Sequence, residues 1–324
     1  MIVVPRETPV TNRIRSELMS FSRGLTPTAP FSSALLAGLA DELRSGGSIC
    51  DLLLNHPAAK APLFGLRALA GVNQLVLSGQ VPRLAALIES TARVGEVWAA
   101  AREVVLTYPD HILAALDRPV QRQLPTRAAE LLRGLAVIGA PRIRLLEIGA
   151  CAGLNLFLDR YHWRGADWQW GDPHSGVRLP GKGPFPGRIE VVDRRGCDLN
   201  PLDPADPADG LVLRSFVPAE HTTERAQLDQ ALRIAAQAGV AIERMGAAPW
   251  LRDRLRDGVD ATVTTVVWHS LVWHHLDPAE QSAAERLLDE AAAGMPVFRV
   301  GFEPANQAAN PTLGVTRYSR PSPT

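Results

Sequence analysis

The sequence has few cysteines, no excess of either charge and no long apolar run. Its three cysteines are widely spaced and form no CxxC pair, which argues against a disulfide framework and a cysteine-based zinc cluster. Basic and acidic side chains balance at 34 each, so no global field favours nucleic acid or an acidic membrane. No stretch of about 18 uncharged apolar residues is present to span a bilayer. We therefore expect no nucleic-acid partner and no membrane partner.

The remaining composition is that of an ordinary globular protein. Hydrophobic residues make up 46% and charged residues 21% of 324 residues, enough to bury a sizeable core. The first residues, Met-Ile-Val-Val-Pro-Arg-Glu, lack the basic and apolar regions of a signal peptide. We expect a cytoplasmic protein that acts on a small-molecule substrate.

The chain divides by pattern into two parts. Up to residue 125 leucines recur at helical spacing and prolines separate the segments, which predicts helices throughout. Residues 126–139 are expected to form the helix that leads into the first strand. From residue 142 onward, short apolar strands alternate with amphipathic helices, the pattern of a mainly parallel sheet covered on both faces. The sequence thus predicts an N-terminal helical substrate or lid domain, 1–125, and an α/β domain, 126–324.

The elements expected in the second part follow from the same patterns. Proline and asparagine are scattered through residues 304–324, so this tail is expected to be weakly structured. The predicted strands are 143–148, 166–171, 188–192, 211–216, 262–269 and 296–302, and the predicted helices are 154–161, 223–238, 247–256 and 278–293.

Residues 142–160 carry the most informative motif. An apolar run ends at Gly149, a loop of small residues ends at Gly153, and a helical pattern follows. A strand, a glycine loop and a helix form the unit that brings a ligand against the backbone. The dinucleotide fingerprint fails, because Cys151 and Leu154 stand at its second and third glycine positions, and no lysine follows Gly153 to hold a phosphate.

The loop does fit Glu-x-Gly-x-x-x-Gly and so resembles motif I of the class I S-adenosylmethionine (SAM) methyltransferases, with Cys151 in place of the middle glycine. The resemblance implies an α/β fold with a Rossmann-like class I methyltransferase sheet, preceded here by an N-terminal all-helical domain. It also implies SAM as cofactor. Glu147 would anchor the neighbouring backbone and the amino group of SAM. The loop residues beneath its methionine part would be Gly149, Ala150, Gly153 and Asn155.

The amino-acid sequence of the loop resembles that of one particular family. Gly-Ala-Cys-Ala-Gly-Leu-Asn-Leu is similar to the Gly-Ala-Ser-Ala-Gly-Leu-Asn-Leu loop of a bacterial family known only as a domain of unknown function. The similarity extends over residues 120–303, through Gly-Cys-Asp at 196–198 and Gly-Phe-Glu at 301–303. Two stretches depart from that family: Gln-Arg-Gln-Leu stands at 121–124 and Val-Pro at 217–218.

Two aspartates are candidates for binding the nucleoside part of the cofactor. Asp172 follows the second predicted strand, where a carboxylate can accept both ribose hydroxyls, although an aspartate before proline is also a common turn residue. Asp198 follows the third predicted strand, where the methyltransferase resemblance implies contact with the adenine amino group, and a turn role is equally open.

Residues 266–275 form a second informative stretch, in which a β-branched strand runs into aromatic and polar residues. His269 is the candidate general base, because an imidazole suits proton removal near neutral pH. Trp268, Trp273 and His274 are candidates for the acceptor pocket, and Glu303 after the sixth predicted strand is a further one. No HExxH motif or carboxylate partner accompanies the histidines, so we expect no metal site. Hydrogen-bonded scaffolding is the alternative role of these histidines.

The sequence therefore predicts a SAM-dependent methyltransferase that acts on a small molecule. The alternative is a repurposed, non-catalytic SAM-fold protein that serves as a binding or partner subunit, which the cysteine in the loop and the two departures favour. An NAD-linked oxidoreductase is disfavoured by the glycine spacing. Whether the chain forms a homodimer or joins a partner, and which acceptor it uses, are left open.

Overall fold

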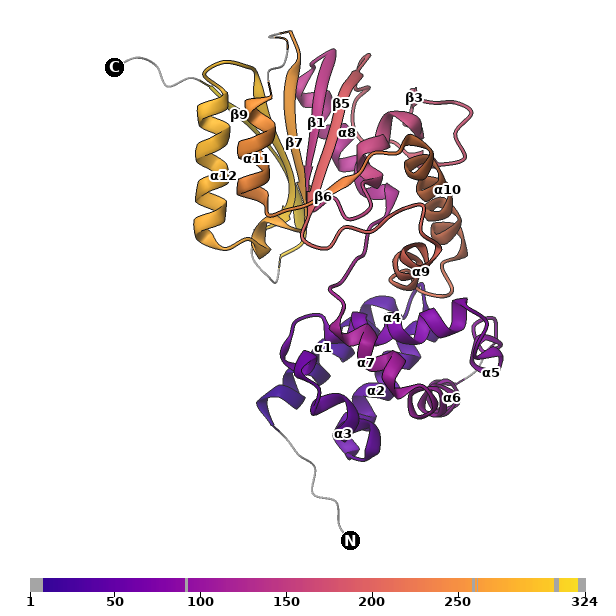
Figure 1. Cartoon of the computed structure of the whole chain (residues 1–324). Coiled ribbons are helices and arrows are strands. Elements are labelled where there is room, and N and C mark those ends of the chain that lie inside the picture. Colours follow the sequence, from indigo (N-terminus) through magenta and orange to yellow (C-terminus); the bar gives the residue numbers. More distant parts are fainter. Residues whose placement is uncertain (1–7, 91–92, 258–259, 261, 306–308, 320–324) are drawn as a thin grey trace. The chain divides into compact units, whose positions relative to one another are not determined.

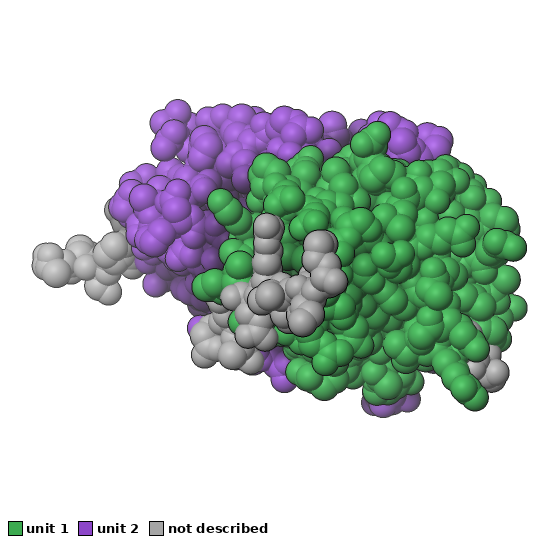
Figure 2. All heavy atoms as spheres, turned by 90° about the horizontal axis from the view of Figure 1, so that it is seen from below, with its two compact units in different colours: residues 1–122, 211–226 green, residues 123–210, 227–324 purple. Residues whose placement is uncertain are grey.

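The computed structural model of the chain is an α/β protein that divides into two compact units (Figures 1 and 2). It describes residues 8–90, 93–257, 260, 262–305 and 309–319. Unit 1 comprises residues 1–122 and 211–226, and unit 2 comprises residues 123–210 and 227–324. Unit 1 therefore includes residues 211–226 from the second half of the chain. The predicted division into 1–125 and 126–324 assigns this segment to the other domain.

Unit 1 is helical in its described residues, as the leucine spacing predicts. Its core is made almost wholly of Leu, Ile, Val and Ala side chains from these helices. The returning segment is held by polar bonds: Asn73 donates to the carbonyl of Ser215, and Ser32 donates to Glu220 through both its backbone N–H and its hydroxyl. The helices are α1 (Pro9–Leu25), α2 (Pro30–Ser45), α3 (Ser48–Leu54), η1 (Pro57–Lys60), α4 (Phe64–Leu77), α5 (Pro82–Ala85), α6 (Val94–Thr107) and α7 (Pro109–Asp117).

Unit 2 contains a six-stranded, mostly parallel sheet with the strand order β6-β5-β1-β7-β8-β9. Only β9 runs antiparallel, beside β8. The central strand β1 is buried along almost its whole length, which explains its continuous apolar sequence. The strands are β1 (Arg142–Ile148), β5 (Glu190–Asp198), β6 (Ile242–Arg244), β7 (Thr264–Ser270), β8 (Val297–Pro304) and β9 (Pro311–Tyr318).

Helices cover both faces of this sheet (Figure 1). Side chains of α11 and α12 pack on one face against Leu146, Val267 and Val297. The other face carries α8, which approaches so closely that a Cβ on Gly134 would meet Val300. The remaining helices are η2 (Pro125–Arg127), α8 (Ala128–Ile138), η3 (Leu154–Arg160), α9 (Pro207–Ser215), α10 (Thr222–Ala238), α11 (Ala247–Arg256), η4 (Trp273–His275) and α12 (Pro278–Ala291).

Three of the predicted elements are wrong. Residues 211–215 of the predicted 211–216 strand lie in α9, because Pro207 starts a helix that Asp206 caps by accepting from the N–H of Ala208. Residues 169–171 do form a strand, β3, but it belongs to a separate sheet. The tail expected to be weakly structured forms β9, whose alternate residues face the protein.

The separate sheet has three short strands in the order β3-β2-β4. Its strands are β2 (His162–Arg164), β3 (Gln169–Gly171) and β4 (Arg178–Pro180). In the main sheet, the neighbours of β1 are β5 and β7, and the predicted 166–171 strand is not part of that sheet. The strand β6 beyond it was not predicted, because three residues are too few to show a period.

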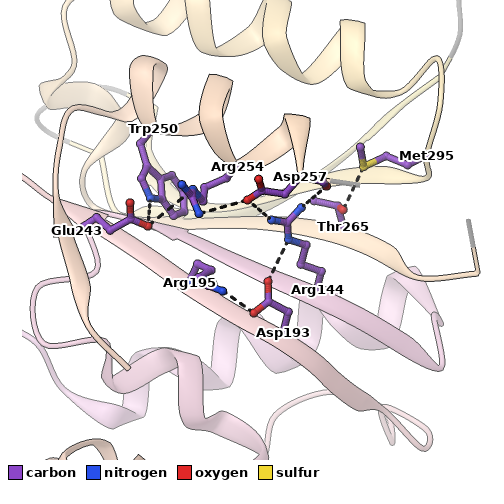
Figure 3. A network of polar contacts seen from close by, with 9 residues as sticks. All are labelled: Arg144, Asp193, Arg195, Glu243, Trp250, Arg254, Asp257, Thr265 and Met295. Atoms are coloured by element: carbon purple, nitrogen blue, oxygen red, sulfur yellow. Dashed lines mark hydrogen bonds and ion pairs between the residues drawn. The ribbon is translucent and has the colours of Figure 1, made fainter. Parts of the chain in front are cut away.

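A network of ion pairs fixes the start of the central strand (Figure 3). Arg144 is buried in β1, and its guanidinium contacts the carboxylates of Asp193 at 3.3 Å and Asp257 at 3.5 Å. Arg254 of α11 also pairs with Asp257, at 3.2 Å. A buried cation is costly unless it is paired, so these partners make the arginine tolerable inside the sheet.

Close helix packing in unit 1 gives a stability test. A Cβ on Gly38 of α2 would overlap the Cβ and Cγ of Trp98, so Gly38→Ala should lower the free energy of unfolding by about 1–3 kcal/mol. Gly95 of α6 faces open space, and Gly95→Ala should leave the stability equal or raise it by up to about 1 kcal/mol. Urea denaturation measures both, and equal stability of the two variants would contradict the packing described.

Candidate functional site

The order of the strands identifies one edge of the sheet as the candidate site. From the central strand β1 the chain adds β5 and β6 on one side, and then returns to add β7 and β8 on the other. The carboxyl ends of β1 and β7 therefore flank a topological switch point, where connections leave in opposite directions. Open α/β sheets bind ligands in the crevice at such a point. The loop at 149–153 follows β1 at this edge.

The backbone of this loop is sharply bent. Gly149, Cys151 and Gly153 all have positive φ, at 69°, 52° and 72°. A Cβ on Gly149 would lie 2.7 Å from Val272, and one on Gly153 would lie 2.8 Å from Ile242. Glycine is thus required at both ends of the loop by conformation and by space.

The backbone amides of the loop are already bonded within the chain. Ala150 N donates to the carbonyl of Cys197, Cys151 N to Asp198 Oδ2, and Gly153 N to the carbonyl of Ala150. Ala152 N donates to the side chain of Gln123. These four amides are therefore not free to bind the oxygens of a phosphate.

Glu147 lies beneath the loop on the face that carries α8. It is buried, and its Oε1 accepts a 2.7 Å hydrogen bond from Asn155 Nδ2. Burial raises the pKa of Glu147 to about 8, against the opposing effect of the hydrogen bond from Asn155. The structure thus brings together two predicted site residues, and both point away from the solvent.

Asp198 ends β5, the strand next to β1, and its half-buried carboxylate lies against the loop. Its Oδ2 accepts the N–H of Cys151 at 2.9 Å, and its Oδ1 accepts the N–H of Asn200 at 2.8 Å. Each oxygen keeps a further lone pair for a ligand. The apolar residue that follows, Leu199, has 66% of its surface exposed.

Asp172 does not lie at this edge. It follows β3 in the separate three-stranded sheet, where it is exposed and its Oδ1 accepts the N–H of His174 at 2.8 Å. That is the turn role left open from the sequence. The prediction that Asp172 ends the second strand of the main sheet is wrong, because β5 fills that place.

A second polar cluster lies on the opposite face of the sheet, at the ends of β7 and β8. Glu303 is its centre: Oε1 accepts from His269 Nδ1 at 2.8 Å and from the N–H groups of Val272 and Trp273 at 3.0 Å each. Its Oε2 accepts from His274 Nδ1 at 2.8 Å. Burial by itself would raise the pKa of Glu303, but these hydrogen bonds outweigh it and lower the pKa to about 2.

His269 is held from several sides. It is 2% exposed, it stacks on Trp273 with the ring centroids 4.7 Å apart, and a Cβ on Gly301 would overlap its imidazole. Burial lowers its pKa although Glu303 raises it, so the ring is neutral at pH 7 and Nδ1 carries the proton given to Glu303. The other nitrogen, Nε2, is buried. A general base must reach a substrate proton, so this geometry does not support His269 in that role.

The other predicted acceptor-side residues differ in accessibility. Trp268 of β7 is wholly buried next to Glu147, its partner on the adjacent strand β1, so it cannot line an open pocket. Trp273 is half-buried between His269 and the guanidinium of Arg299, which lies 4.5 Å from the ring centroid. His274 is exposed at the edge.

Local sequence patterns did not place Gln123, Leu199 or Val272 at this edge, although Gln123 lies in one of the two departing stretches and Val272 in the 266–275 stretch. A glutamine far from the loop in the chain has no local pattern that shows its contact, whereas an exposed leucine directly after Asp198 could have been noted. Among the described residues, no group of three or more His, Cys, Asp or Glu side chains is arranged to hold a metal ion. In the same part of the chain, no helix is long and apolar enough to cross a bilayer.

The lowered pKa of Glu303 predicts a loss of stability in acid. Because the folded-state pKa lies below the usual 4.5, the contribution is complete above pH 4.5 and is lost as the pH falls toward 2. Glu303→Gln should lower the free energy of unfolding at pH 7 by about 3 kcal/mol and should remove this acid dependence. Urea denaturation at pH 7 and pH 3.5 tests it, with exposed Glu290→Gln as the control. If Glu303→Gln were as stable as Glu290→Gln, the stabilising hydrogen bonds described for Glu303 would be refuted.

Glu147 predicts the opposite dependence. Its folded-state pKa of about 8 lies above the usual 4.5, so folding becomes less favourable as the pH rises between these values. The slope is about 1.4 kcal/mol per pH unit in that window. Glu147→Gln should remove this slope, as measured by urea denaturation at pH 6 and 7.5 beside the same Glu290→Gln control. Parallel slopes for Glu147→Gln and the unsubstituted chain would mean that the carboxyl is not buried as described.

Comparison with known proteins gives a family and no activity. No curated protein and no solved structure matches the chain. One family model matches residues 15–324 and is described as an uncharacterized protein conserved in bacteria (DUF2332). This confirms the resemblance to a bacterial domain of unknown function that the Gly-Ala-Cys-Ala-Gly loop indicated. The match covers nearly the whole chain, and the protein therefore belongs to the DUF2332 family of bacteria.

Proposed function

We propose that this protein is a SAM-dependent methyltransferase that acts on a small molecule. The observation that carries the proposal is the meeting of the glycine loop after β1 with the Asp198 carboxylate at the end of the adjacent β5, beside the switch point that β1 and β7 flank. The strand order supports a Rossmann-like sheet of the class I methyltransferase type. It has the glycine-loop strand at its centre and an antiparallel last strand at its edge.

The electrostatics of this edge favour a cationic nucleoside over a phosphate ligand. The Asp198 carboxylate flanks the loop together with the buried carboxyl of Glu147, whose raised pKa leaves it mostly neutral at pH 7. The N–H groups of residues 150–153 are already bonded within the chain. A pyrophosphate would meet two carboxyl groups and few free donors. A sulfonium nucleoside carries positive charge and two ribose hydroxyls, which a carboxylate can accept. This contrast disfavours an NAD-linked oxidoreductase.

The residues present fit the proposed cofactor. Asp198 has a free lone pair on each oxygen for the ribose, and the exposed Leu199 offers an apolar side chain that could cover the adenine ring. Gly149 is half-exposed at the bend where the methionine part would pass. Cytoplasmic location and a small-molecule substrate remain predictions from composition.

In this proposal the protein contributes binding and orientation. Bound SAM would supply an activated methyl group, and the chain's own residues would fix its position relative to the acceptor. Holding two reactants in line can account for about 7–11 kcal/mol of a barrier. Glu303 and His269 would fix the turn that places Val272 beside Gly149, and so shape the acceptor side.

A repurposed SAM-fold protein without catalysis is the second candidate. It is favoured by the side chains of Val272 and Ile242, which pack against Gly149 and Gly153 at the two ends of the loop. Such packing leaves less room over the loop than an open cradle would. The protein would then serve as a binding or partner subunit.

Titration of the 324-residue chain with SAM and with S-adenosylhomocysteine, followed by calorimetry, tests the proposal. Both should bind, and Asp198→Asn should weaken each by at least about tenfold, the loss of one charged hydrogen bond. Asp206→Asn is the matched control, because Asp206 accepts an N–H two residues ahead in the same way as Asp198. Absence of binding at millimolar ligand would refute the proposal.

Two further arms separate the alternatives. Binding of SAM without methyl transfer to any member of a panel of small acceptors would favour the non-catalytic candidate, whereas a response to NADH would favour the oxidoreductase. Asp172→Asn tests whether Asp172 rather than Asp198 binds the ribose. Because Asp172 has a turn role away from the loop, this variant should bind SAM like the unsubstituted chain.

A further inference from the structure

Gln123 holds the glycine loop from the side. Its Nε2 donates to the carbonyl of Ala150 at 2.7 Å, and its Oε1 accepts the N–H of Ala152 at 3.0 Å. The side chain is 5% exposed, so these bonds are shielded from water. The primary amide thus pairs with the backbone on both sides of Cys151, as a neighbouring strand would.

The residue between these two bonds is the one that needs support. Cys151 has φ 52°, the left-handed region that glycine adopts readily and other residues avoid. It stands where the motif resembled by this loop has its middle glycine. A cysteine there must be held by its surroundings, because its own conformational preference opposes the bend.

The hydrogen bonds around Cys151 supply that restraint. Gln123 fixes the residues before and after it, and Asp198 accepts the N–H of Cys151 itself. The same bend presents the N–H of Cys151 to the Asp198 carboxylate. A change in the loop would therefore break its bond to the carboxylate that is proposed to bind ribose.

We propose, relying on the methyltransferase function above for the identity of the ligand, that Gln123 is the positioning residue that keeps the loop in its SAM-binding conformation in place of the missing middle glycine. Gln123 touches the loop only and acts on the ligand through it. The restraint becomes unnecessary where residue 151 is glycine, so the effects of the two positions are coupled.

A double-mutant cycle on the full chain tests this proposal, with Gln123→Ala, Cys151→Gly and the two combined. Gln123→Ala should speed hydrogen exchange at the Ala152 amide and weaken SAM binding, each by at least about tenfold, because two buried bonds are lost. Cys151→Gly alone should change binding little, and the double variant should recover to within about threefold of the unsubstituted chain. Gln227→Ala is the matched control, since Gln227 also accepts a backbone N–H, that of Arg178.

Three results would overturn the proposal: unchanged exchange at Ala152 in Gln123→Ala, faster exchange with unchanged SAM affinity, or no recovery in the double variant. If Gln123→Ala does not fold, Gln123→Met keeps a side chain of similar length but removes both hydrogen bonds to the loop, and the same shifts are expected. If the unsubstituted chain binds no SAM, the methyltransferase proposal fails, while hydrogen exchange at Ala152 in Gln123→Ala still decides whether Gln123 restrains the loop.

Discussion

The candidate site depends on the close approach of the bend after β1 to the adjacent strand β5. Ala150 donates its N–H to the carbonyl of Cys197, and its side chain lies against Gly196, where a Cβ would come within 2.6 Å of it. Any side chain at Gly196 would push the loop away from β5. The bend then could not meet Asp198, so this one backbone contact positions the carboxylate, the loop and the buried Glu147 together.

The two faces of the same sheet edge carry different polar clusters. On the face of α8, Glu147 is buried, accepts one hydrogen bond from Asn155, and its carboxyl is costly to ionise. On the face of α11 and α12, Glu303 is satisfied by four hydrogen-bond donors and organises a turn. Burial alone would raise the pKa of both carboxyls, and the number of donors decides that one is raised and the other lowered.

Local patterns predicted the elements that are long or wholly buried. Strong signals are present in the apolar runs of β1 and β7 and in the amphipathic spacing of α10, α11 and α12. Burial requires an apolar side chain at nearly every position of a buried strand and once or twice in each turn of a helix that packs on the sheet. The three residues of β6 were too few to show a period. At 211–216 an apolar run was assigned to a strand, but apolar runs occur in buried helices as well, and Pro207 with Asp206 makes this one helical.

By itself the sequence determined the glycine loop, the α/β class and the resemblance to a bacterial family, since turn conformation and burial period are encoded by neighbouring residues. Only the tertiary structure decided which aspartate lies beside the loop, that Gln123 bridges Cys151, and that His269 faces Glu303. The residues joined by these three contacts lie 47, 27 and 34 positions apart in the chain, respectively. Strand order brings such pairs together, and strand order is set by packing of the whole sheet, which no local pattern records.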